Sequence, residues 1–131
     1  MDSQTIEWKQ IREKAGPFAP EAFEFVREGL AHTVKMIHGR EAMDELEFTG
    51  DERHVDGRQL CMGLRDFAIN QYGMLAKTVL SRWGVQRTDD FGRIVFAMIE
   101  AGFMRQSDDD VFEDFQGVYD FDEAFAVDMN N

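Results

Sequence analysis

Residues 88–121 read TDDFGRIVFAMIEAGFMRQSDDDVFEDFQGVYDF. In residues 88–101 the apolar side chains recur at steps of three and four, the pattern of an amphipathic helix; they are Phe91, Ile94, Val95, Met98 and Ile99. Thr88 is a suitable N-cap, and Gly102 ends the helix. Two short runs of β-forming residues follow, at 103–106 and 118–121, on either side of an acidic connector. This order predicts the third helix and the β-hairpin wing of a winged-helix domain.

Two further predicted helices precede this stretch and complete the order of a winged helix. The first is capped by Asp56 and ends at Gly73, and the second spans residues 74–83. Residues 84–87 then fit the tight turn of a helix-turn-helix motif. With Val55 as a small first strand, residues 54–131 are predicted to form a winged-helix-like domain with an acidic tail.

Residues 1–53 are predicted to form two helices and an acidic connector. Ser3 can cap a helix that runs to about residue 15. Pro20 begins a second helix that ends at Gly39, and its apolar stripe comprises Phe23, Val26, Leu30, Val34 and Ile37. Residues 40–53 are rich in acids and connect the two parts. The predicted fold is therefore mainly α with a small β-hairpin: an N-terminal helical pair followed by a winged-helix-like domain, folded as one compact unit.

The charge of the chain argues against nucleic acid as a partner. The 131 residues, enough for one domain with a buried core, include 14 Lys and Arg against 26 Asp and Glu, a formal net charge of −12. Residues 107–131 contain nine acidic residues and no basic one. Such a field repels the phosphate backbone, which supplies most non-specific affinity for nucleic acids.

The cysteine content and the N-terminus predict a cytoplasmic protein. Cys61 is the single cysteine, which is typical of a reducing compartment. The sequence shows neither a basic and apolar leader nor an apolar run of about eighteen residues, so neither secretion nor a membrane is expected.

Four segments of the chain resemble a known protein family. They are HVDGRQL (54–60), LSRWG (80–84), TDDFGRIVF (88–96) and DFQGVYDF (114–121). They resemble an uncharacterised, conserved hypothetical bacterial family found mainly in Planctomycetes and Verrucomicrobia, over residues 18–125. The family has no assigned activity, so the resemblance implies a bacterial cytoplasmic origin and no functional residue.

One triplet copies a catalytic motif. Asp90, Phe91 and Gly92 match the magnesium-binding triplet of protein kinases, but the glycine-rich loop, strand lysine and catalytic loop of kinases are absent. We therefore expect Asp90 to be a helix-start acid and Phe91 a core residue, while Gly92 either permits close packing or is simply tolerated.

The sequence predicts no metal, cofactor or catalytic site. An EF-hand loop starting at Asp108 fails, because a glutamate stands where the loop needs its glycine. A loose divalent site among the acids of residues 108–114 stays open. His32 and His38 face different sides of their predicted helix, and His54 and Cys61 have no partner ligands at a recognised spacing.

The remaining function classes are a binding module, a nucleic-acid regulator and an enzyme without a recognisable motif. In a DNA-reading winged helix, residues 88–101 would present Asp89 and Asp90 to the bases, beside an acidic wing. This favours a non-catalytic module that binds a protein partner. The predicted interaction surface comprises Arg82, Arg87, Arg93, Arg105, Asp108, Asp109 and Asp110.

Overall fold

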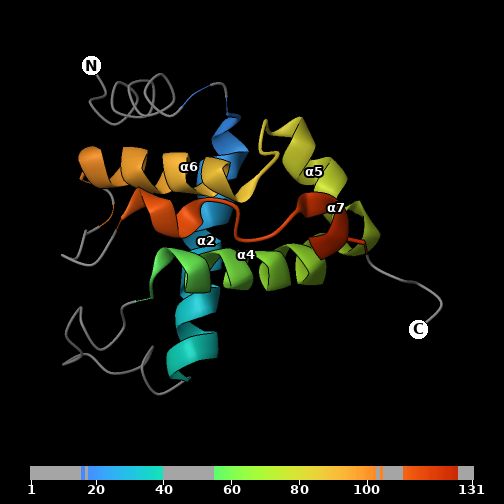
Figure 1. Ribbon diagram of the computed structural model, residues 1–131, viewed down its shortest axis with the longest axis horizontal. Coiled ribbons are helices and arrows are strands. Elements are labelled where there is room, and N and C mark those ends of the chain that lie inside the picture. Colours follow the sequence, from blue (N-terminus) through green and yellow to red (C-terminus); the bar gives the residue numbers. More distant parts are fainter. Residues whose placement is uncertain (1–15, 17, 40–54, 103, 105–110, 127–131) are drawn as a thin grey trace.

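The structure, a computed structural model, describes residues 16, 18–39, 55–102, 104 and 111–126 (Figure 1). Within these ranges the chain forms helices and turns, and it contains no strand. The elements are α2 (Pro20–His38), α4 (Gly57–Tyr72), η2 (Gly73–Leu75), α5 (Ala76–Arg82), α6 (Thr88–Glu100), η3 (Phe112–Phe115) and α7 (Phe121–Ala124). None of these helices is long and apolar enough to cross a membrane.

The predicted β-hairpin wing is wrong. Residues 118–120 form an irregular loop, and Phe121 begins the helix α7. The end of the expected connector is the 3-10 helix η3, and Val55 lies outside any strand. Of the other expected wing strand, 103–106, only Met104 is described, and it lies in a bend. The described part of the chain is therefore all-α, and the winged-helix prediction is withdrawn.

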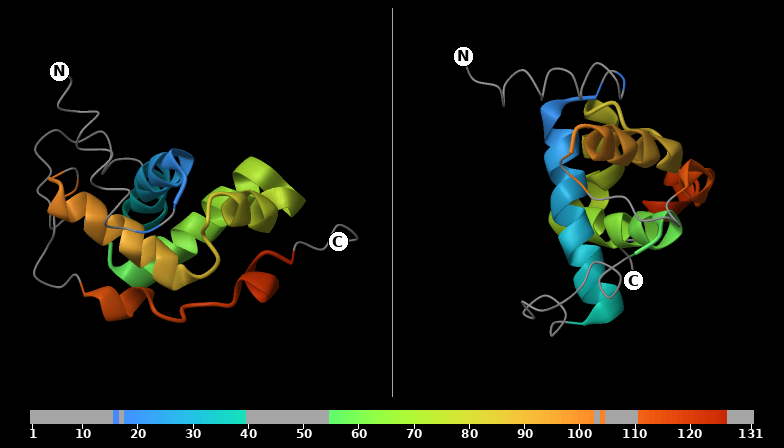
Figure 2. Two further views of the ribbon diagram at one scale, coloured as in Figure 1. Left: turned by 90° about the horizontal axis from the view of Figure 1, so that it is seen from above. Right: turned by 90° about the vertical axis from the view of Figure 1, so that its left-hand side faces the viewer.

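The described helices are arranged in three layers. Helices α4 and α6 lie side by side, and α2 crosses them on one face. Residues 111–126 cover the opposite face, where η3 contacts both α4 and α6 (Figure 2). The core therefore fills the space on both sides of the α4 and α6 pair.

Helices α2 and α4 approach closely because a glycine of each lies in their interface. A Cβ atom on Gly63 would stand 1.8 Å from the hydroxyl oxygen of Thr33. A Cβ atom on Gly29 would stand 2.2 Å from Cδ2 of Leu64. Thr33 is fully buried, and its hydroxyl donates a 2.7 Å hydrogen bond to the carbonyl of Gly29. Small residues thus set the distance between the two helices.

Sequence signals fix both ends of α4 as predicted. Asp56 accepts a 2.7 Å hydrogen bond from the backbone amide of Gln59, whose side chain accepts from the amide of Asp56 in return. This is a reciprocal capping box. At the other end Gly73 has a φ of 54°, a conformation that glycine adopts without strain.

The C-terminal segment is anchored by aromatic side chains. Phe115 is buried against Gly57 of α4 and Gly92 of α6, where added Cβ atoms would approach its side chain to 2.8 Å. Phe91 of α6 is fully buried, with ring centroids 6.4 Å from Phe25 of α2 and 5.9 Å from Phe121 of α7. Phe91 therefore joins all three layers, and the expected roles of Phe91 in the core and of Gly92 in close packing are confirmed.

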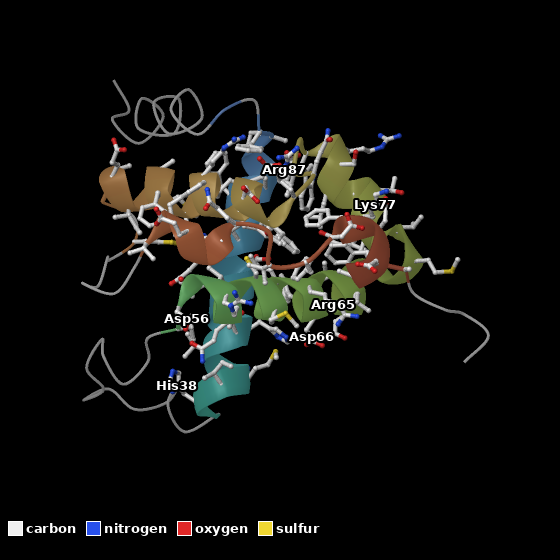
Figure 3. The ribbon with its side chains drawn as sticks, viewed as in Figure 1. His38, Asp56, Arg65, Asp66, Lys77 and Arg87 are labelled. Atoms are coloured by element: carbon white, nitrogen blue, oxygen red, sulfur yellow. The ribbon has the colours of Figure 1, made fainter. Side chains whose placement is uncertain are left out.

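Polar contacts hold the same segment to α4 and α5 (Figure 3). Nε of Arg65 donates a 2.9 Å hydrogen bond to the carbonyl of Ala124, and Lys77 forms an ion pair with Asp122. The hydroxyl of Tyr119 donates a 2.7 Å hydrogen bond to the carbonyl of Cys61. Residues 111–126 are therefore an integral part of the fold.

Candidate functional site

The structure describes three of the residues predicted to form an interaction surface. Arg82, Arg87 and Arg93 are exposed, at the end of α5, before α6 and on α6. The other four, Arg105, Asp108, Asp109 and Asp110, lie outside the described residues.

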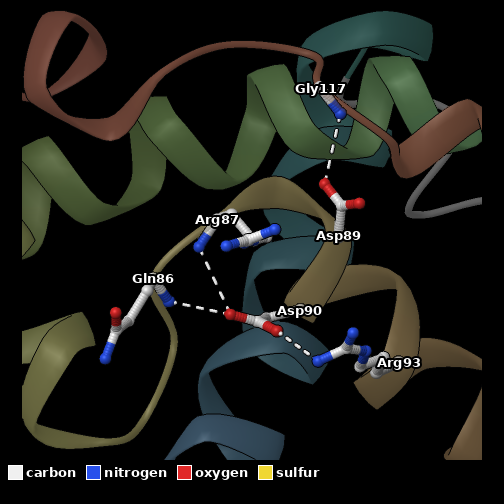
Figure 4. Close-up of polar contacts among 6 residues, drawn as sticks. All are labelled: Gln86, Arg87, Asp89, Asp90, Arg93 and Gly117. Atoms are coloured by element: carbon white, nitrogen blue, oxygen red, sulfur yellow. Dashed lines mark hydrogen bonds and ion pairs between the residues drawn. The ribbon is translucent and has the colours of Figure 1, made fainter.

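Asp90 is a structural acid at the start of α6 (Figure 4). Its Oδ2 accepts hydrogen bonds from the backbone amides of Gln86, at 2.9 Å, and Arg87, at 3.3 Å. Its Oδ1 lies 3.1 Å from Nη1 of Arg93. The Asp90 side chain is 9% exposed, so it fixes the turn into α6 and positions Arg93. The expected role of Asp90 as a helix-start acid is confirmed.

The two residues before Asp90 hold the C-terminal loop. The hydroxyl of Thr88 accepts a 3.1 Å hydrogen bond from the amide of Val118, and Asp89 accepts a 3.2 Å bond from the amide of Gly117. Thr88 is therefore the first residue of α6 and binds a distant loop, where the sequence predicted an N-cap. Thr88 thus binds the backbone amide of Val118, the first residue of the predicted strand 118–121.

Cys61 and Tyr119 have the environment of structural groups. Desolvation by burial, with a smaller contribution from the negative charge of Asp89, raises the pKa of the Cys61 thiol far above its ordinary value. Burial likewise raises the pKa of the Tyr119 phenol. Both groups are therefore protonated at neutral pH, and Cys61 is a thiol without nucleophilic character. His54, the other potential metal ligand near this position, lies outside the described residues.

His32 ties α2 to α4. Its Nε2 lies 2.7 Å from Oδ2 of Asp66, which also accepts a 3.2 Å hydrogen bond from Asn70. The imidazole packs against the ring of Phe67 at a centroid distance of 5.3 Å. In the described part of the chain no group of three or more His, Cys, Asp or Glu side chains could hold a metal ion. The acids of 108–110 fall outside that part.

An open pocket lies where the N-terminal half of α2 meets the end of α4 and the residue after α5. Its volume is about 170 Å³. Four aromatic side chains form one group of its lining residues: Phe25, Phe67, Tyr72 and Trp83. Polar residues form the other group: Glu21, Glu24, Glu28 and Gln71. We call this the aromatic pocket.

The rings of the aromatic pocket pack against one another. Phe25 is buried beneath the others, with centroids 5.3 Å from Phe67 and 5.6 Å from Trp83. Tyr72 and Trp83 meet edge to face, at 5.9 Å and 82°. The carbonyl of Trp83 accepts a 3.0 Å hydrogen bond from the amide of Ala19, which fixes Trp83 beside the start of α2. The pocket thus has a rigid aromatic lining in which Phe67, Tyr72 and Trp83 are half-buried.

Three glutamates of α2 form the polar rim. Glu21, Glu24 and Glu28 follow at steps of three and four residues, which places them on one face of the helix. Nη2 of Arg27 lies 2.5 Å from Oε1 of Glu24, and both side chains are about half exposed. Glu21 and Glu28 are exposed and have no ion-pair or hydrogen-bond partner among the described side chains. Two carboxylates that are unpaired within the described part of the chain therefore lie beside an aromatic surface.

The sequence did not predict the aromatic pocket. The available signal was the acidic spacing on α2 together with aromatic residues at the ends of two other helices, Tyr72 and Trp83.

Comparison of the chain with protein-family models, with curated proteins and with solved structures found no match.

Proposed function

We propose that this protein is a non-catalytic, acidic, all-helical module that binds a positively charged segment of a protein partner in the bacterial cytoplasm. The aromatic pocket is the binding site in this proposal. The observation that carries it is the combination of half-buried rings with two carboxylates, Glu21 and Glu28, that have no partner among the described residues. Aromatic faces attract cations through their quadrupole, and carboxylates attract them through their charge.

The charge of the whole chain supports a basic partner. A net charge of −12 on 131 residues produces a long-range negative potential. Such a field speeds the approach of a cationic segment and slows that of an anionic one. The pocket would then supply the short-range contacts.

A nucleic-acid regulator reading DNA with residues 88–101 is the weaker candidate. Thr88, Asp89 and Asp90 bind backbone amides of the flanking loops, so the start of α6 is engaged within the protein. Arg93 is paired with Asp90. A small enzyme is also weaker, because burial keeps the Cys61 thiol protonated and so without nucleophilic character.

Intrinsic fluorescence tests the proposal directly. Trp8 and Trp83 are the two tryptophans of the chain, so Trp8→Phe makes Trp83, in the pocket, the only tryptophan reporter. We expect an eight-residue oligolysine peptide to change Trp83 fluorescence saturably at about 100 mM salt. At that ionic strength charges more than about 10 Å apart are largely screened, so the signal reports local contacts.

A matched pair of variants separates the pocket from the general charge. Glu21→Gln with Glu28→Gln should weaken peptide binding about tenfold, the sum of two partly exposed charge contacts. Glu113→Gln with Glu123→Gln changes the net charge equally at exposed residues outside the pocket and should change affinity less than twofold. Equal weakening by both pairs would contradict the proposal. So would salt-sensitive binding of random duplex DNA by the unmodified chain.

A further inference from the structure

On the premise that the aromatic pocket binds a basic segment, as proposed above, we infer that the group seated in it is the guanidinium of an arginine, in preference to the ammonium of a lysine. Ring geometry, the acceptors on the rim and the size of the pocket support this assignment.

The rings offer flat surfaces to a flat cation. Tyr72 and Trp83 line the pocket at 82° to each other, and both are half-buried. A guanidinium is planar and weakly hydrated, so it stacks on an aromatic face at a small desolvation cost. An ammonium is compact and strongly hydrated, and it gains less from the same surface.

The rim offers hydrogen-bond acceptors. Carboxylates accept hydrogen bonds only, and a guanidinium carries five N–H donors in one plane, which matches a carboxylate in bidentate fashion. The protein already makes one guanidinium–carboxylate contact on this rim, a single hydrogen bond from Nη2 of Arg27 to Oε1 of Glu24 at 2.5 Å. Glu21 and Glu28 present the same acceptor group without a partner among the described residues.

The size of the pocket fits one side-chain head group. Its volume of about 170 Å³ is well below the roughly 300–1,000 Å³ of sites for drug-sized ligands. A single cationic side chain can occupy it, while the rest of the partner segment lies outside.

Two peptides of equal charge test the choice of cation. We expect a peptide of alternating glycine and arginine to bind about fivefold more tightly than its glycine and lysine counterpart, measured by calorimetry at about 100 mM salt. Trp83→Leu should lower the affinity for the arginine peptide to that for the lysine peptide. The same substitution should change the affinity for the lysine peptide less than twofold. Trp83→Phe keeps an aromatic face and should retain part of the preference, which guards against misfolding of the leucine variant.

The outcomes distinguish this inference from the proposed function. Equal affinity for the two peptides, with both weakened by Glu21→Gln and Glu28→Gln, would overturn the arginine assignment and leave the basic-segment module standing. An arginine preference that survives in Trp83→Leu would overturn the role of the ring. Absence of binding by either peptide would overturn the proposed function, and the arginine assignment with it.

Discussion

Replacement of Gly63 by alanine should destabilise the protein by forcing α2 and α4 apart. The new Cβ atom would stand 1.8 Å from Oγ1 and 2.6 Å from Cβ of Thr33. Overpacking of this severity costs about 3 kcal/mol, the upper end of the usual range. Loss of the buried hydrogen bond from Thr33 to Gly29 would add about 1 kcal/mol, and the better helix propensity of alanine would return about 1 kcal/mol. We therefore expect the free energy of unfolding to fall by about 3 kcal/mol.

Urea unfolding followed by circular dichroism measures this change, and the midpoint of thermal unfolding should fall by about 10 °C. Met62→Ala, at the exposed neighbouring position on α4, is the control and should change stability by less than about 0.5 kcal/mol. Adding Thr33→Ala to Gly63→Ala removes the contact with Oγ1 at 1.8 Å and leaves the one with Cβ at 2.6 Å, so the double variant should recover about 1 kcal/mol by relieving part of the clash. A Gly63→Ala protein as stable as the unmodified chain, or a double variant without recovery, would refute this account of the helix crossing.

Three further predictions concern the side chains of Asp90, Tyr119 and Cys61. Asp90→Ala removes the acceptor for two backbone amides and should lower the free energy of unfolding, measured in urea, by about 2 kcal/mol. An unchanged midpoint of urea unfolding would show that these amides find other partners. Tyr119→Phe loses the hydrogen bond to the carbonyl of Cys61 and should cost about 1 kcal/mol, with the ring packing kept; a cost near zero would contradict the bond. Burial raises the pKa of the Cys61 thiol in the folded state, so above about pH 8.5 only the unfolded state loses the thiol proton. The free energy of unfolding should therefore decline as the pH rises past that value, by up to about 1.4 kcal/mol per pH unit. Cys61→Ser should flatten this decline in urea titrations between pH 7 and 9.5, and an equally steep decline in the variant would assign it to other groups.

The helices could be predicted from the sequence because their signals are local. Asp56 and Gly73 carry the capping chemistry of α4 in their own side chain and backbone freedom. The apolar period of α6 also identifies its buried face: Phe91 and Ile94 are fully buried, and Ile99 at the end is half-buried. Such features are determined by neighbours in the sequence.

The β-hairpin prediction is wrong because residue types that favour strands pack against helices in this protein. Val118, Tyr119 and Phe121 have high strand propensity, but that propensity measures a fit to any half-buried surface. Here the surface is formed by α4 and α6, and Thr88 supplies the acceptor that a partner strand would have offered to Val118. The spacing of apolar residues in the sequence cannot distinguish packing against helices from pairing with a strand.

Periodicity also overstated burial at helix ends. Ile37 ends the predicted apolar stripe of the helix that begins at Pro20, yet it is 42% exposed, and Leu75 at the start of the predicted helix 74–83 is 62% exposed. The aromatic pocket escaped prediction for a related reason: Tyr72 and Trp83 belong to different segments and come together only through tertiary packing.

The space that Gly57 and Gly92 leave for the Phe115 side chain has a consequence for the order in which the core can form. Gly57 and Gly92 leave space on two helices that only a residue made later in the chain can fill. Until residues 111–126 have emerged from the ribosome, α4 and α6 present an unfilled apolar face, as does Phe91 on the side that Phe121 covers. The core is therefore complete only when the C-terminal segment is in place, and a released chain truncated after residue 102 would expose this apolar face to aggregation and to chaperones.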